Sequence, residues 1–285
     1  MLGVSDGQRH NPPLFRKFRR RMESRAIPSV LTGLLPILTS MKTSSAFLLL
    51  AAVGLLWSQQ AAPPASPAPR PPTGPYTAAE LAAIALTPPR AGASVTKTLF
   101  DGKTLNGWSG SSDWWSVEDG AIVGKSSGKV PTSFLFTKDN YTDFRLTVSS
   151  QMVTSENHAG VCFWGEVIEE GANKWNTRGP LVIFPYPFMW DYIEAKGLRV
   201  YYLTREKVTA QHDWVKVEIL AQGNRVRSAL NGVEVMEWRE PDPSRIKVGP
   251  IGLQLHGFDG EQKVLYKDVV VETFPKEDRL LTVKK

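Results

Sequence analysis

Hydrophobic and polar residues alternate with a period of two over much of the chain beyond residue 95. The clearest stretches are residues 144–148, 215–219 and 233–236. Successive side chains of a strand point to opposite faces, so this pattern is typical of strands with one buried face. Three dipeptides that suit two-residue hairpin turns occur in the same region: Asp119-Gly120, Gly223-Asn224 and Asn231-Gly232. The sequence therefore predicts an all-β sandwich of two antiparallel sheets.

Residues 41–62 have the layout of a secretory signal peptide. Lys42 precedes an apolar core over residues 46–57, and small residues follow at Ala61 and Ala62. Because this core is much shorter than the roughly 20 residues that span a bilayer, we expect cleavage and no membrane span afterwards. Since no cysteine lies near the cleavage site, a lipoprotein is not expected. The sequence predicts a secreted or periplasmic protein.

An Arg-rich stretch precedes this signal peptide, with FRKFRRR at residues 15–21. The simplest interpretation is that Met41 is the true start and that residues 1–40 are an extension of the reading frame. The alternatives are a long leader, a twin-arginine-like signal or a nucleic-acid-binding arm. Without residues 1–62 the chain has 26 basic and 26 acidic side chains, so no nucleic-acid partner is expected.

The remaining chain divides into three parts. Residues 63–94 form a Pro/Ala-rich linker, in which residues 76–86 are expected to form one short helix with Thr77 and Glu80 as a capping box. Residues 95–275 form the sandwich, and residues 276–285 are a C-terminal tail. Cys162 is the only cysteine, which excludes an intrachain disulfide.

Three longer motifs lie within the predicted sandwich. They are LFDGKTLNGWSGSSDWWSVEDGAIVGK at residues 99–125, HDWVKVEILAQGNRVRSALNGVEVMEW at residues 212–238, and VGPIGLQLHG at residues 248–257. Together they resemble the 3-keto-disaccharide hydrolase family over residues 95–274. The resemblance implies a concanavalin A-like jelly-roll sandwich and a hydrolase that acts on 3-keto-glycosides or disaccharides. Any NAD would then belong to a partner enzyme that makes the keto sugar.

A ketone at C3 acidifies the C2 proton, so the glycosidic bond can break by elimination before water adds back. This route needs a base, a group that stabilises the enolate and an acid for the leaving oxygen. We predict His256 or Glu166 as the base, Gln254 or a bound cation as the stabiliser, and Asp191 or Glu194 as the acid.

Aromatic rings stack on the apolar faces of sugars, so the tryptophans are candidate ligand contacts. Trp164, Trp175 and Trp190 lie between the motifs, and either sugar contact or core packing fits them. Strand alternation would place Trp164 on the same face as Cys162 and Glu166. For Trp108, Trp115, Trp214 and Trp238 core packing is expected.

Other polar residues complete the predicted site. Asn157 and His158 are further candidate sugar contacts, and the aromatic segment at residues 184–197 is expected to form one wall of a pocket. No His-rich metal motif or EF-hand is visible, and a cofactor is not evident. The carboxylates of Asp191, Glu194 and Asp259 are suitable Ca²⁺ ligands, so the sequence does not exclude a Ca²⁺ site.

Two other functions remain compatible with these residues. One is a non-catalytic carbohydrate-binding module, since a β-sandwich hosts both lectins and enzymes. The other is a structural surface domain attached through the Pro-rich segment. The expected partner is a carbohydrate in the first two cases, and the oligomeric state stays open.

Overall fold

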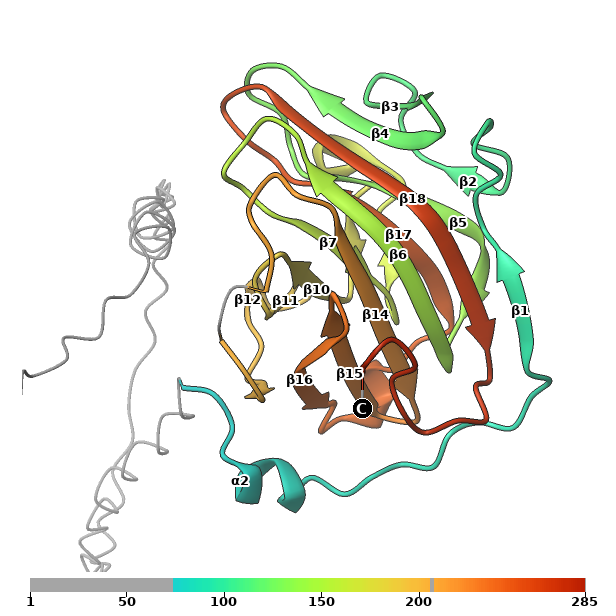
Figure 1. Cartoon of the computed structure of the whole chain (residues 1–285), viewed down its shortest axis with the longest axis vertical. Coiled ribbons are helices and arrows are strands. Elements are labelled where there is room, and N and C mark those ends of the chain that lie inside the picture. Colours follow the sequence, from blue (N-terminus) through green and yellow to red (C-terminus); the bar gives the residue numbers. More distant parts are fainter. Residues whose placement is uncertain (1–73, 206–207, 285) are drawn as a thin grey trace, which may run out of the picture. The chain divides into compact units, whose positions relative to one another are not determined.

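The computed structural model describes residues 74–205 and 208–284 (Figure 1). The predicted extension, the signal peptide and most of the Pro-rich segment therefore lie outside the described residues. The described residues form two stacked antiparallel sheets, which confirms the predicted all-β sandwich. None of the helices in these residues is long and apolar enough to cross a membrane.

The first sheet, sheet A, has nine strands. In spatial order these are β13 (Tyr201–Tyr202), β16 (Val233–Arg239), β15 (Arg225–Leu230), β14 (Val215–Gln222), β6 (Phe144–Met152), β18 (Gln262–Thr273), β4 (Ala121–Ser126) and β3 (Trp115–Glu118). The ninth strand, β1 (Val95–Thr98), also pairs with β18. The longest strand, β18, therefore pairs with β1, the first strand of the sandwich, and with the central strand β6.

The second sheet, sheet B, has seven strands. Their order is β12 (Lys196–Gly197), β11 (Phe188–Asp191), β10 (Pro180–Phe184), β7 (Ala159–Cys162), β17 (Gly249–Leu255), β5 (Ser133–Tyr141) and β2 (Trp108–Ser109). A separate pair consists of β8 (Glu166–Val167) and β9 (Thr177–Arg178). The helical elements are α2 (Ala78–Ala83) and the 3-10 turns η1 (Gly171–Asn173) and η2 (Pro243–Arg245).

The core lies between the two sheets and follows the predicted alternation on β6 and β14. Phe144, Leu146 and Val148 are all buried there, as are the alternate residues of β14. The prediction for β16 was wrong, because Val233 is exposed while Val235 and Met236 are both buried. A β-bulge shifts the pairing of β15 with β16, so strict alternation ends at this point.

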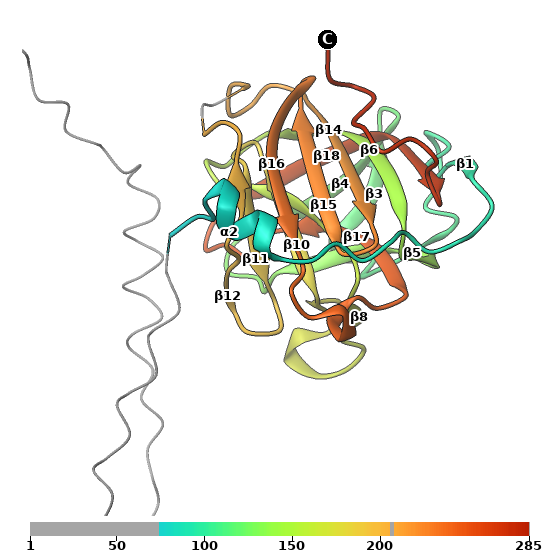
Figure 2. The same ribbon diagram turned by 90° about the horizontal axis from the view of Figure 1, so that it is seen from below.

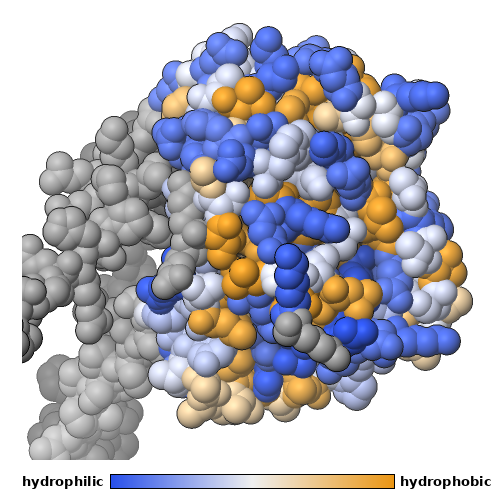
Figure 3. All heavy atoms as spheres, viewed as in Figure 1, coloured by the Kyte–Doolittle hydropathy of each residue, from blue (hydrophilic) through white to orange (hydrophobic). Residues whose placement is uncertain are grey.

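The turns and most of the tryptophans agree with expectation. Asp119-Gly120 and Asn231-Gly232 have positive φ at both residues and close the β3–β4 and β15–β16 hairpins. Trp108, Trp115 and Trp238 are buried in the core. Trp214 is instead partly exposed, with the Lys267 Nζ 4.2 Å from the centre of its ring. On the face seen in Figure 3, apolar residues form separate patches among hydrophilic side chains.

Residues 74–94 are packed against sheet A. The predicted capping box is present, since Thr77 and Glu80 bond reciprocally at the start of α2. The helix ends at Ala83, and the chain then runs in extended form past the ends of β15 and β14 towards β1 (Figure 2). The Asn224 side chain accepts from the Thr87 nitrogen at 2.9 Å and donates to the Ala85 oxygen at 3.0 Å. The described part of the predicted linker is therefore a fixed part of the fold.

The C-terminal tail covers the outer face of sheet A. Glu218 on β14 is fully buried there and accepts bonds from the Leu281 and Thr282 nitrogens at 2.8 and 2.7 Å. Leu280 is buried beside Leu220 and Ala229. The centre of sheet A is thus covered on both faces, and the tail extends the folded unit beyond the predicted boundary at residue 275.

Candidate functional site

The outer face of sheet B, the face turned away from the core, brings most of the predicted site residues together. Alternation along β5, β7, β10 and β17 directs a second set of side chains to this face. They are Phe134, Phe136, Cys162, Leu181, Ile183 and Gln254. Every one of them is buried. The middle of this face is therefore a second, smaller hydrophobic core, and burial raises the pKa of the Cys162 thiol to about 12.

The chain turns out of sheet B at Trp164. Its φ of 53° is left-handed, which ends the strand alternation after β7. The indole returns to the main core beside Trp238, and its Nε1 donates to the Thr142 oxygen at 2.6 Å. The predicted placement of Trp164 with Cys162 and Glu166 on one face was wrong. A side chain that is 1% exposed offers no surface for a sugar.

The segment after Trp164, residues 165–178, folds over the outer face and is named the flap segment here. Its base is tightly packed, because a Cβ on Gly249 would lie 2.1 Å from the Gly165 oxygen. Val167 and Trp175 of the flap segment pack on the outer-face cluster, and the Trp175 oxygen accepts from the Phe134 nitrogen at 2.7 Å.

Residues 184–197 cover the same face from the other side. They contain β11 and β12 instead of one irregular loop, and Phe188, Trp190 and Tyr192 pack on the cluster. Tyr192 meets the ring of Phe134 edge-on at 5.6 Å, and its OH accepts from Gln254 Nε2 at 3.0 Å. Gln254 is 0% exposed, so it is held as a buried packing residue away from any solvent-accessible substrate.

One end of the outer face carries a pair of histidines. The rings of His158 and His256 are 4.3 Å apart between centroids, at an angle of 64°, and both are partly exposed. The Gln262 amide supports the backbone of His256, since it accepts from the His256 backbone nitrogen at 3.2 Å and donates to the His256 backbone oxygen at 3.3 Å. The structure therefore brings together three of the predicted site residues, Asn157, His158 and His256.

Burial keeps this pair uncharged. It lowers the pKa of His256 to about 4. Burial, together with repulsion from His256, also holds the pKa of His158 well below its usual value. A neutral imidazole has a lone pair that can accept a proton, as a general base must, but the lowered pKa also makes each imidazole a weaker base than a free histidine.

The same shifts predict the pH dependence of stability. Between about pH 6.5 and 4 the unfolded chain binds protons on these histidines that the folded chain does not, so the free energy of unfolding falls as the pH falls. We expect urea denaturation between pH 7 and 4.5 to show a smaller pH slope in His256→Gln than in the wild type. Equal slopes in both proteins would contradict these pKa shifts.

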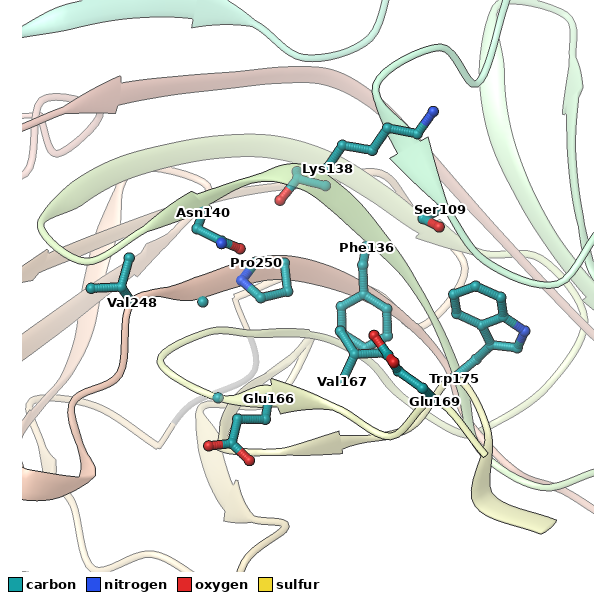
Figure 4. Close-up of a pocket in the computed structure, with 13 residues that line it drawn as sticks. Ser109, Phe136, Lys138, Asn140, Glu166, Val167, Glu169, Trp175, Val248 and Pro250 are labelled. Atoms are coloured by element: carbon teal, nitrogen blue, oxygen red, sulfur yellow. The ribbon is translucent and has the colours of Figure 1, made fainter. Parts of the chain in front are cut away.

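Glu166 lies at the opposite end of the face. It lines a shallow pocket of about 460 Å³ between the flap segment and strands β5 and β17 (Figure 4). His256 follows Pro250 of this pocket by six positions along and just beyond β17, a distance of about 20 Å at roughly 3.3 Å per residue. His256 and Glu166, the two predicted bases, therefore belong to different places.

The two predicted acids lie away from both ends of the outer face. Arg245 binds Asp191 at 2.7 Å and Glu194 at 3.3 Å, and Asp191 is fully buried. Asp191 also pairs with Pro180 on β10. Along the strand direction, Pro180 lies about five residues, or roughly 17 Å, from the position opposite His158. Asp191 and Glu194 thus both pair with Arg245 at a distance from the His pair, and their predicted role as the acid stays a prediction.

The possible Ca²⁺ ligands do not converge. The carboxylates of Asp191 and Glu194 bind the Arg245 guanidinium. Asp259 forms an isolated backbone β-bridge with Lys129, near the His pair. Across residues 74–205 and 208–284, no group of three or more His, Cys, Asp or Glu side chains is arranged to hold a metal ion.

Some residues at these places were not predicted from the sequence. Tyr192 closes the face over Gln254, and Lys138, Asn140 and Pro250 line the pocket with Trp175. Pro250 lies in the motif at residues 248–257, and the other three lie outside the three motifs. The only local signal was the two-residue period of β5 and β17, which assigns faces but does not show what covers them.

The comparison with protein families gives one match. The model of the 3-keto-alpha-glucoside-1,2-lyase-like domain matches residues 95–272, which is more than half of the chain. No curated protein matches the sequence significantly.

Several solved structures are similar to this chain. One is a candidate glycosyl hydrolase from Parabacteroides distasonis, with 21% identity, a TM-score of 0.47, and coverage of 63% of this chain and 94% of that one. A carbohydrate-binding module, CBM66, from Bacillus subtilis has 16% identity, a TM-score of 0.43, and coverage of 59% and 96%. A Bacillus licheniformis β-glucanase has 10% identity, a TM-score of 0.44, and coverage of 65% and 100%.

Proposed function

Because this chain belongs to the 3-keto-alpha-glucoside-1,2-lyase-like domain family, we propose that it cleaves the glycosidic bond of glycosides that carry a ketone at C3. The match agrees with the resemblance of the three sequence motifs and supports a carbohydrate-active function. The observation that carries the finer proposal is the pair of neutral, partly exposed histidines at the end of the outer face of sheet B.

In the proposed reaction, His256 removes the proton from C2, next to the ketone. The electron pair of the C–H bond moves towards the ketone and forms an enolate. The enolate then re-forms the ketone and makes the C1–C2 double bond as the C1–O bond breaks, and the leaving oxygen takes the proton from the His256 imidazolium. Addition of water across the double bond then yields the free keto sugar, so the net reaction is hydrolysis. His158 is the nearest second imidazole and would donate a hydrogen bond to the enolate oxygen.

The test uses 3-keto-trehalose and 3-keto-lactose, with release of free sugar followed by mass spectrometry. We expect His256→Asn and His158→Asn to lower kcat/KM by about 100-fold or more, the usual contribution of general base catalysis. His212→Ala is the matched control, since this histidine bonds the Met152 oxygen and Glu156 instead of the pair. In D₂O, deuterium should enter C2 in the wild type but not in His256→Asn.

Unchanged rates in both histidine variants would remove the pair from the mechanism. If the wild type releases no sugar from either substrate, cleavage itself is overturned. A parallel assay with EDTA tests whether a metal ion is needed. Because Gln254 is buried, the enolate would be stabilised by His158 or by an added cation such as Ca²⁺. Loss of activity with EDTA that Ca²⁺ restores would assign that role to the cation. The proposal includes export of the chain before it acts, as the signal-peptide pattern predicts.

Non-catalytic carbohydrate binding is the second candidate, and a specific observation favours it. The centre of the outer face is closed by packed side chains, and the predicted acids are paired with Arg245. Measurable sugar binding by a wild type that releases no sugar would support this function over cleavage.

A further inference from the structure

We propose that the pocket between the flap segment and strands β5 and β17 is a second sugar-binding site, which holds a neutral pyranose without cleaving it. The pocket extends along β17 from Pro250, about 20 Å from His256, to Trp175, whose oxygen bonds Phe134 opposite Gln254, two residues before His256. Neither residue of the His pair lines the pocket, so sugar binding there can be tested apart from the cleavage reaction.

The pocket combines an apolar floor with a polar rim. Val167 and Pro250 supply apolar surface above the buried Phe136, and Val248 is 69% exposed, the most exposed of the large hydrophobic residues described. Trp175 forms the wall that the flap segment contributes (Figure 4). Its size, about 460 Å³, falls within the range of pockets that bind small ligands.

Trp175 is held firmly in place. Its φ of 66° is left-handed, which is costly for a bulky residue and persists only where the surroundings impose it. Its nitrogen donates to the Ile168 oxygen at 2.8 Å, and its oxygen accepts from Phe134 at 2.7 Å. A fixed, partly exposed indole is the kind of group that stacks on the C–H face of a pyranose.

The charges around the pocket favour a neutral ligand. Lys138 contributes a positive charge, and Glu166 and Glu169 contribute two negative charges. Figure 4 shows the Lys138 ammonium and the Glu166 carboxylate pointing in opposite directions at the rim. Such a rim offers both donors and acceptors to hydroxyl groups, with Asn140 able to do both. Lys174, whose Nζ lies 5.2 Å from the centre of the Trp175 ring, supplies a second positive charge, so the charges balance and favour neither a phosphate nor an ammonium ligand.

The experiment titrates the full chain with trehalose, cellobiose and lactose, which lack the ketone and so are not substrates of the proposed cleavage. Saturable binding is followed by calorimetry. We expect Trp175→Ala to weaken binding at least 10-fold, Trp175→Phe to weaken it less than about 3-fold, and His256→Asn to leave it unchanged. Asn140→Ala and Val248→Ala, at exposed positions, provide independent variants that do not threaten the fold.

Three results would overturn the proposal. The first is the absence of saturable binding of all three sugars to the wild type. The second is binding that is unchanged in Trp175→Ala and also in Asn140→Ala and Val248→Ala. The third is binding lost in His256→Asn but kept in Trp175→Ala, which would move the sugar to the His pair.

Discussion

Replacing Trp164 with alanine is expected to lower the free energy of unfolding by about 3–5 kcal/mol, the usual cost of removing a large aromatic side chain from a core. The indole is 1% exposed, lies beside Trp238 and donates to the Thr142 oxygen. The variant would leave a cavity between the sheets and an unpaired buried carbonyl. Urea denaturation of both proteins measures the change.

Trp164 also positions the flap segment, because its left-handed backbone turns the chain out of sheet B. We therefore expect trypsin to cleave the Trp164→Ala variant faster at Lys174 and Arg178, both exposed in the flap segment. Trp164→Phe, which keeps most of the volume, should lose less stability and keep the wild-type cleavage rate. A loss below about 1 kcal/mol in Trp164→Ala, with unchanged proteolysis, would show that the indole anchors neither the core nor the flap segment.

The features predicted correctly from the sequence are local ones. A capping box spans four residues, a hairpin turn spans two, and the alternation of β6 and β14 follows from the pleat of the strand itself. These features depend on neighbours in the chain, so the order of the residues suffices to recognise them.

Contacts between distant segments could not be predicted from the sequence. The partner of Asp191 is Arg245, and Gln254 is buried by Tyr192, in each case across more than 50 residues of chain. Alternation correctly placed Gln254 and His256 on one face, but it could not show that the middle of this face is covered. Trp164 was misplaced for a local reason, a positive φ that no glycine or asparagine signals.

Replacing Glu218 with alanine is expected to destabilise the protein by about 1.5–3 kcal/mol, because it removes charged hydrogen bonds to the buried Arg145 and to the C-terminal tail, while Glu272 still binds Arg145 at 2.7 Å. Arg145 is 4% exposed in its side chain and donates to Glu218 at 3.0 Å. The Glu218 carboxylate also accepts from the Leu281 and Thr282 nitrogens and from Thr282 Oγ1. Arg145 in turn donates to the Glu277 and Arg279 oxygens, so both charges hold the C-terminal tail.

Thermal and urea denaturation of Glu218→Ala measure this loss, with Glu156→Ala as the control. Glu156 forms an exposed pair with His212 and should contribute only about 0–1 kcal/mol. Deletion of residues 277–285 should destabilise the protein to a similar extent, since it removes most of the partners of Glu218 and uncovers Leu220. If that deletion is neutral while Glu218→Ala is not, the ion pair with Arg145 alone stabilises sheet A. If both are neutral, water replaces the tail on this face, and the sandwich ends at the boundary that the sequence predicts, residue 275.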